Sequence, residues 1–203
     1  MDSYTPFLTW RFDTALQFAS GLHHQQPRKG TTIPYIAHLM SVCALVIEAG
    51  GDEDQAIAAL LHDAVEDQGG LPTLDTIRQI FGKRVADAVE SCSDSTVSDP
   101  KNKGLWRTRK EKYLEHLRGT DNKDALLIAA ADKLHNARAM LSDYQEIGEQ
   151  LFLRFNASKE DQFWYYGELV ETLRKKAAPK PLVDELERVV KELTRLAKSP
   201  QPL

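Results

Sequence analysis

Apolar residues along the chain recur mainly at helical spacing. Residues 8–22 and 34–49 place them three and four positions apart, which is typical of helices that bury one face. Gly50 and Gly51 follow the second stretch, and a glycine pair is a frequent helix end. No alternating pattern of strand type extends beyond a few residues. The pattern therefore predicts an all-α fold.

The same spacing continues to the C-terminus, with breaks at Gly, Pro and polar loops. Further helices are expected at residues 56–67, 73–81, 85–92, 105–117, 123–144, 159–176 and 182–198. Loops are expected at 25–32 and 94–104, and the tail 199–203 should fray. No internal repeat or linker is evident. We expect one domain over residues 1–203, a bundle of about eight or nine helices.

Composition narrows the function classes. The 203 residues carry 26 Lys and Arg against 30 Asp and Glu, a formal net charge of −4. Proteins that bind duplex nucleic acid need a basic surface, so such a partner is not expected. Two cysteines are too few for a disulfide scaffold or a Cys-rich zinc site. No apolar run is long enough for a membrane span, and the N-terminus does not resemble a signal peptide. We expect a cytoplasmic protein.

Ionisable residues interrupt the most apolar predicted helix. Six apolar residues, 56–61, lead directly into His62 and Asp63, and Glu66 and Asp67 follow one turn later. Burying an ionised carboxylate is costly unless it is paired or binds a metal. This run therefore indicates a site. The alternative is that Glu66 and Asp67 simply form the solvated end of the helix.

Two other predicted helices contain similar exceptions. Seven apolar residues, 125–131, precede Asp132, and His38 shares an apolar face with Val42 and Leu45. The alternative for Asp132 is an ion pair with a Lys or Arg. The alternative for His38 is a hydrogen-bonded core residue, which is the usual role of a lone His on an apolar face. Two imidazoles and two carboxylates form a mixed N/O set that suits a divalent first-row metal. Spacing alone does not show that they meet.

Three motifs, in this order, resemble a known family: RK…PYIAH, then ALLHDAVED, then AADKLHNAR. They are similar to the HD-domain metal-dependent phosphohydrolases, and within these to the hydrolase domain of the RelA/SpoT homologues, above all the stand-alone small alarmone hydrolases. The resemblance covers about residues 18–139, the motif-bearing core, and the C-terminal helices 159–198 fit the group in kind. It implies an HD-domain helical bundle with a central metal site.

The resemblance also implies roles for individual residues. His38, His62, Asp63 and Asp132 match the ligands of one metal, usually Mn²⁺. Glu66 and Asp67 match the pair that activates and orients the attacking water. The positions implied for the substrate are Arg28, Lys29, Tyr35, Lys133, Asn136 and Arg138. The sequence departs from the family's pattern in two places, which are a loop of different length after Lys29 and the segment QGGLPT after the acidic pair.

The implied activity is hydrolysis of the 3′-pyrophosphate of guanosine tetraphosphate or pentaphosphate, which yields GDP or GTP and pyrophosphate. Alternatives within phosphohydrolysis are the 2′-phosphate of NADPH and the adenine alarmones. A non-catalytic nucleotide-sensing module and a purely structural helical protein are further alternatives. The motifs are not followed by a nucleotide-synthesising domain, so a monofunctional enzyme is expected. The C-terminal helices could support a homodimer.

Overall fold

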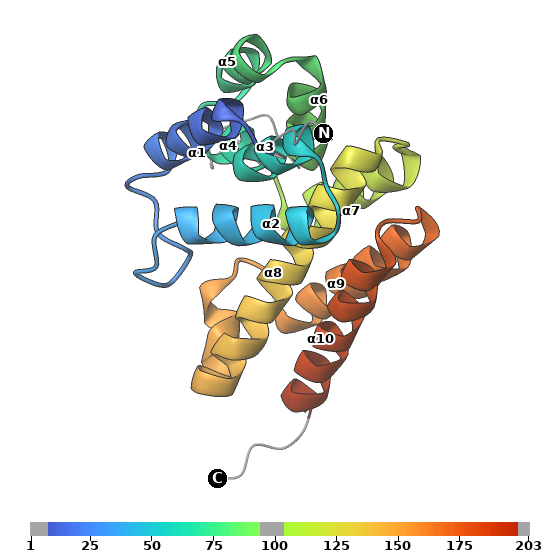
Figure 1. Ribbon diagram of the computed structural model, residues 1–203. Helices are drawn as coiled ribbons and strands as arrows, with labels where there is room; N and C mark the ends of the chain where they lie inside the picture. The colour runs from blue at the N-terminus through green and yellow to red at the C-terminus, as the bar shows by residue number, and fades with distance from the viewer. Residues whose placement is uncertain (1–7, 94–103, 199–203) are drawn as a thin grey trace, which may run out of the picture. The chain divides into compact units, whose positions relative to one another are not determined.

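A computed structural model describes residues 8–93 and 104–198. Within these ranges the regular elements are all helices, apart from one isolated bridge between Pro27 and Pro34. The prediction of an all-α fold is therefore confirmed. The chain divides into two compact units, Met1–Pro100 and Lys101–Leu203, each with its own helices (Figure 1). The predicted loop at 94–104, except Gly104, and the tail 199–203 lie outside the described residues.

The first unit is organised around α3. Its helices are α1 (Trp10–Leu22), α2 (Ile36–Glu48), α3 (Glu53–Leu61), α4 (Ala64–Asp67), α5 (Leu71–Phe81) and α6 (Lys83–Cys92). Helix α3 packs against α1, α2 and α6, and α5 packs against α6 (Figure 1). The six residues from Ala56 to Leu61 are all buried. A helix that is apolar on every side belongs inside a core, which is where α3 lies.

A tight turn and a cap fix the start of α3. A Cβ atom on Gly51 would lie 2.8 Å from the carbonyl oxygen of Val46, so only glycine fits between α2 and α3. Asp52 then caps α3: its side chain accepts from the amide of Gln55, and the Gln55 side chain accepts from the amide of Asp52. These local bonds set the direction in which α3 leaves α2.

The end of α3 differs from the sequence prediction. One continuous helix was expected over residues 56–67, but α3 ends at Leu61 and α4 begins at Ala64. Asp63 lies between them with φ −98° and ψ −2°, away from regular helical values. The His62 Nδ1 atom bonds the carbonyl oxygen of Ala59 at 2.7 Å, which in an unbroken helix would accept from the amide of Asp63. The helix thus breaks inside the motif.

The second unit contains α7 (Trp106–Gly119), α8 (Lys123–Ile147), the 3₁₀ helix η2 (Gly148–Arg154), α9 (Lys159–Lys175) and α10 (Lys180–Lys198). Helix α10 packs along α8 and α9, and α7 packs against α9 (Figure 1). The buried residues of α10, which include Leu182, Leu186, Val189 and Leu193, follow the spacing of an amphipathic helix. The sequence pattern did not predict η2, which begins at Gly148 with φ 58°.

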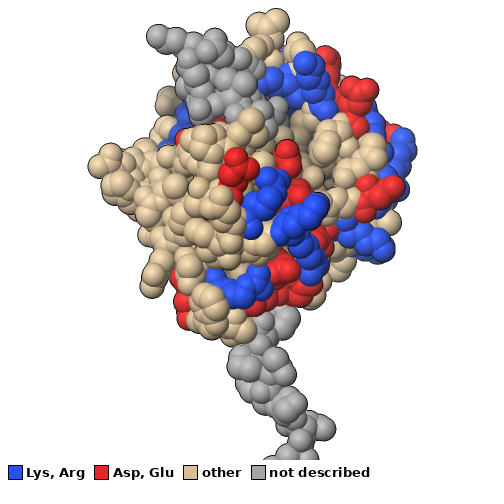
Figure 2. Space-filling view, turned by 90° about the horizontal axis from the view of Figure 1, so that it is seen from above, with Lys and Arg blue, Asp and Glu red and all other residues tan. Residues whose placement is uncertain are grey.

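Charged side chains of both signs are intermixed on the face shown in Figure 2. Exposed ion pairs in the first unit include Arg84 with Asp52 at 2.8 Å and Arg78 with Asp75 at 3.2 Å. Exposed pairs of this kind contribute little stability. None of the described helices is both long and apolar enough to cross a membrane.

Candidate metal centre

Two buried histidines from neighbouring helices meet in the first unit. His38 lies in the first turn of α2, and His62 follows the last residue of α3; both are almost fully buried. Their rings stand edge to face with centroids 5.2 Å apart. Each offers a nitrogen that could bind a metal, and these atoms lie within 4.8 Å of one another. The packing of α2 against α3 brings them together.

Asp63 completes a convergent set of three donors. Its Oδ2 atom lies 3.4 Å from Nε2 of His38 and 3.1 Å from Nε2 of His62. In an unbroken helix, adjacent residues point about 100° apart around the axis, so their side chains diverge. The break after Leu61 lets His62 and Asp63 face the same point. The sequence prediction treated residues 56–67 as one helix in which His62 and Asp63 are adjacent, and the structure brings their side chains together where that helix is interrupted.

The hydrogen bond of His62 favours a cation at this point. Its Nδ1 atom faces a carbonyl oxygen, which can only accept, so Nδ1 carries the proton. In neutral imidazole, Nε2 then presents a lone pair toward the Asp63 carboxylate oxygen, 3.1 Å away. Two acceptors at this distance repel unless they share a proton or bind the same metal ion. Imidazole nitrogen and carboxylate oxygen suit divalent first-row metals, so the donor set fits a divalent metal ion.

Tyr35 approaches the same carboxylate. It precedes α2, and its hydroxyl donates to Asp63 Oδ2 at 2.6 Å. The loop before it is held by two backbone bonds, from Tyr35 to Gln26 and from Arg28 to Ile33, both 2.8 Å. The Arg28 guanidinium lies 5.8 Å from the centre of the Tyr35 ring. The structure therefore places Tyr35 and Arg28 beside the histidines, whereas Lys29 is exposed on the same loop.

The acidic pair lies on α4, the single helical turn after the break. Glu66 and Asp67 are both partly exposed. Asp67 accepts a hydrogen bond from the Gln26 side-chain amide at 2.8 Å. A carboxylate held in this way, one turn from Asp63, has a fixed orientation and remains accessible to water. These are the properties required of a group that accepts a proton from water.

In the second unit, Asp132 is a buried carboxylate with two partners on its own helix. It is 6% exposed, Oδ2 lies 2.5 Å from Lys133 Nζ, and Oδ1 accepts from Asn136 Nδ2 at 2.5 Å. Burial alone would lower the pKa of Lys133, but the charge of Asp132 raises it well above its usual value. The ion pair considered from the sequence is therefore present. Arg138, by contrast, is exposed and lies 3.4 Å from Glu185 of α10.

A family model described as HD domain matches residues 15–159, which is more than half of the chain. The chain belongs to the HD-domain family. It is 32% identical over 138 residues to a guanosine-3′,5′-bis(diphosphate) 3′-pyrophosphohydrolase of Aquifex aeolicus, covering 68% of this chain and 19% of that protein. It is also 32% identical over 131 residues to the Drosophila melanogaster guanosine-3′,5′-bis(diphosphate) 3′-pyrophosphohydrolase MESH1, covering 63% of this chain and 68% of that protein.

A solved structure of a metazoan ortholog of SpoT, described as hydrolysing ppGpp, matches this HD-domain chain with a TM-score of 0.73. The match is 26% identical and covers 94% of this chain and 98% of that one. The HD-domain chain spans about a fifth of the length of the Aquifex relative. The resemblance inferred from the three motifs is thus confirmed at the level of the family.

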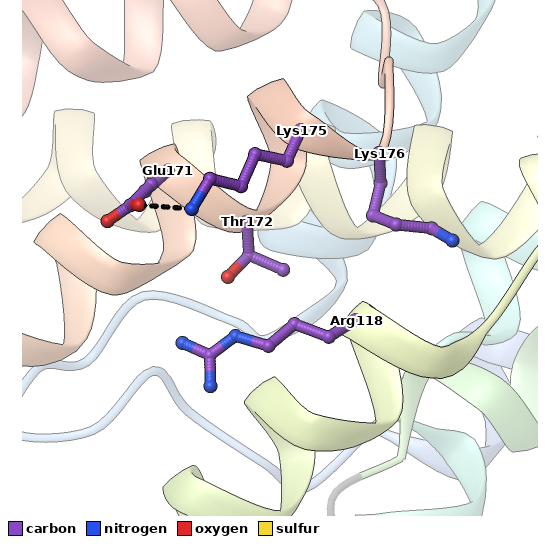
Figure 3. Close-up of a pocket in the computed structure, with 5 residues that line it drawn as sticks. All are labelled: Arg118, Glu171, Thr172, Lys175 and Lys176. Atoms are coloured by element: carbon purple, nitrogen blue, oxygen red, sulfur yellow. Dashed lines mark hydrogen bonds and ion pairs between the residues drawn. The ribbon is translucent and has the colours of Figure 1, made fainter.

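A separate pocket in the second unit of the HD-domain chain collects positive charge (Figure 3). It has a volume of about 280 Å³ and is lined by Arg118, Glu171, Thr172, Lys175 and Lys176. Each cation has an acidic partner: Arg118 pairs with Glu168, Lys175 with Glu171, and Lys176 with Asp121. These cations also lie near the C-terminal ends of α7 and α9, where positive charge stabilises a helix. The pocket is therefore explained by helix ends and ion pairs.

Two polar residues near the histidines, the buried His23 and the partly exposed Gln26, were not predicted as site residues. His23 is the C-cap residue of α1, its backbone amide donates to the carbonyl oxygen of Ala19, and it is 2% exposed. Gln26 lies in the following loop and contacts both His23 and Asp67. One signal was available in the sequence, because His23 continues the four-residue spacing of Ala15 and Ala19, which are fully buried.

Proposed function

We propose that this HD-domain protein hydrolyses the 3′-pyrophosphate of guanosine tetraphosphate or pentaphosphate, releasing pyrophosphate and GDP or GTP. The observation that carries the proposal is the convergence of the His38 and His62 Nε2 atoms on Asp63 Oδ2. The names of the Aquifex and Drosophila relatives give the substrate class. Because the family match runs from residue 15 to residue 159 across both units, we propose one hydrolase domain over the whole chain.

We further propose that His38, His62, Asp63 and Asp132 hold one divalent metal, Mn²⁺ in the working enzyme. The first three residues supply two nitrogens and one oxygen, and Asp132 would add a second carboxylate from the other unit. When bound, a metal of this kind acidifies water and offsets charge that develops on a phosphoryl group. The bonds from Asn136 and Lys133 to Asp132 support its role, because such partners fix the orientation of a ligating carboxylate.

The acidic pair on α4 would handle the proton of the attacking water. In the proposed reaction, water adds to the phosphorus joined to the ribose 3′-oxygen, and the bond between that phosphorus and the oxygen breaks. Glu66 would accept the proton of the water, and Asp67, fixed by Gln26, would orient it. The hydroxyl of the water stays on the phosphorus, and the proton that Glu66 accepted passes to the departing 3′-oxygen, so the products are a 3′-hydroxyl and pyrophosphate.

Basic and amide side chains would hold the substrate. We assign Arg28 and Lys29 to the nucleotide, Tyr35 to the pocket wall, Asn136 to direct contact, and Lys133 and Arg138 to phosphate. Arg28 lies close to the histidines through Tyr35, which supports its role. The exposed pair of Arg138 with Glu185 would have to open for Arg138 to reach phosphate. We also propose a cytoplasmic location, which suits a protein with two free thiols. We further propose a homodimer, which light scattering will test.

The decisive experiment is product analysis with purified protein, Mn²⁺ and a panel of ppGpp, pppGpp, ppApp and NADPH. A parallel sample with excess chelator is the control. Release of pyrophosphate from ppGpp that requires Mn²⁺ would support the proposal. Release of orthophosphate from NADPH alone, or of pyrophosphate from ppApp alone, would assign a different substrate to the same metal site. Absence of turnover of every substrate, with Mn²⁺ bound, would favour a nucleotide sensor.

A further inference from the structure

We propose that His23 is a positioning residue that fixes both Asp67 and Tyr35 through two separate contacts of one buried ring. The inference rests on the proposed function, because it concerns how the acidic pair and Asp63 are held for hydrolysis. His23 follows α1 and is 2% exposed. One contact runs through a hydrogen bond to Gln26, and the other is a stacked ring contact with Tyr35.

The first contact determines which end of the Gln26 amide faces Asp67. Gln26 Nε2 donates to Asp67 Oδ2 at 2.8 Å, and an ionised carboxylate can only accept. The amide oxygen must therefore point the other way, toward His23 Nδ1 at 2.8 Å and Gln68 Nε2 at 2.5 Å. Both groups act as donors, so His23 carries its proton on Nδ1. Without these donors, the amide could rotate and present its oxygen to Asp67.

The neutral state of His23 agrees with this assignment. Burial lowers its pKa, against the opposing effects of the Gln26 hydrogen bond and the nearby Asp63 and Asp67 charges. Its Nε2 atom is buried, and no hydrogen-bond partner for it occurs in the described part of the chain. An imidazole protonated only on Nδ1 leaves Nε2 as an acceptor and requires no second proton.

The second contact acts on the metal side of the site. The His23 and Tyr35 rings are stacked, with centroids 5.1 Å apart and planes 18° apart. Stacking holds the Tyr35 ring in the plane from which its hydroxyl donates to Asp63 Oδ2 at 2.6 Å. A single side chain thus orients a donor to the proposed metal ligand and a donor to the proposed water-orienting carboxylate. A hydrophobic residue in this place could provide only the ring contact.

Two substitutions separate the two contacts. His23→Phe keeps a ring for stacking and removes the donor, whereas His23→Asn keeps a donor near the Nδ1 position and removes the ring. We expect His23→Phe to lower kcat for ppGpp about tenfold to a hundredfold, with KM and Mn²⁺ affinity changed less than about threefold. His23→Asn should restore most of kcat but weaken Mn²⁺ binding through Tyr35. His24→Phe, at the adjacent exposed histidine, is the matched control and should match the wild type.

Equal losses of kcat in His23→Phe and His23→Asn would overturn the donor role, as would wild-type kcat in His23→Phe. If His23→Phe does not fold, Gln26→Met removes the relay at a less buried position and should give the same fall in kcat. Wild-type kcat in Gln26→Met would overturn the inference.

A spectroscopic measurement separates this inference from the proposed function. The ¹⁵N chemical shifts of the imidazole distinguish a proton on Nδ1 from a proton on Nε2, and His23→Phe identifies the signals of His23. We expect the Nδ1-protonated form in the wild type, with a shift toward Nε2 protonation in Gln26→Met. A wild type that does not hydrolyse ppGpp would refute the proposed function and leave this result standing. Protonation on Nε2 in the wild type would refute the positioning inference alone.

Discussion

The Tyr35 hydroxyl donates to Oδ2 of Asp63, the same oxygen toward which the Nε2 atoms of His38 and His62 point. This bond leaves less freedom to the carboxylate and holds it in the orientation in which it faces both imidazoles. Tyr35→Phe removes only the hydroxyl. We expect Mn²⁺ affinity, measured by calorimetry, to fall about tenfold, while the fold and melting temperature of the metal-free protein stay unchanged. An unaltered affinity would show that the tyrosine serves substrate binding instead.

Replacing a proposed ligand should remove metal and activity together. Asp63→Asn keeps the size of the side chain and removes its charge, so Mn²⁺ should no longer stabilise the protein. For the wild type, Mn²⁺ at a hundred times its dissociation constant should add about 2.7 kcal/mol to the unfolding free energy. Thermal melts with and without Mn²⁺ measure both proteins. Asp13→Asn, at an exposed position on α1, is the control and should keep the full metal-induced shift.

Glu66 should affect turnover and not metal binding. Glu66→Gln keeps the shape of the side chain but cannot take a proton from water. General-base catalysis contributes about 10²–10⁴-fold, so kcat should fall within that range while Mn²⁺ affinity stays near the wild-type value. Stopped assays of pyrophosphate release together with calorimetry check this. A loss of metal in Glu66→Gln would reassign Glu66 as a ligand.

The core around α3 should be sensitive to the loss of volume. Ile57 is completely buried, and Ile57→Ala should lower the unfolding free energy by about 2–5 kcal/mol. Ile80→Ala is the matched control, because Ile80 is 50% exposed and such surface changes usually stay within about 0.5 kcal/mol. Urea unfolding followed by circular dichroism gives both values. Equal effects at the two positions would contradict the central place of α3 in the first unit.

The two cysteines should differ in reactivity. Burial raises the pKa of the Cys43 thiol from its ordinary 9.0 to about 12, so Cys43 stays protonated and shielded at pH 8. Cys92 is partly exposed and should react first with a thiol reagent. As the pH rises from 9 toward 12, an unfolded Cys43 loses its proton while the folded one keeps it, so stability should fall. Cys43→Ala should flatten that fall. Equal labelling rates at pH 8 would refute the assignment.

Much of the fold could be read from local periodicity, because an apolar stripe is a property of each segment. The expected helices at 159–176 and 182–198 correspond to α9 and α10, with small shifts at their ends. The unusual placement of His62 and Asp132 in apolar runs was also visible, and both are buried. The break between Leu61 and Ala64 was not predicted, since periodicity favours helix through a motif that the site itself interrupts.

The sequence by itself determined the all-α class, the identity of α3 as a core helix, and the burial of His38, His62 and Asp132 in apolar helices, but not the burial of His23. The tertiary structure decided how these side chains are directed. Asp63 and His62 both lie in the interruption between α3 and α4, where their side chains approach to 3.1 Å, and His23 reaches Asp67 only through Gln26 in the neighbouring loop. The physical reason is that the burial of a helix face follows from the spacing of apolar residues within one segment. The convergence of several side chains on one atom, such as Asp63 Oδ2, depends on how separate segments pack.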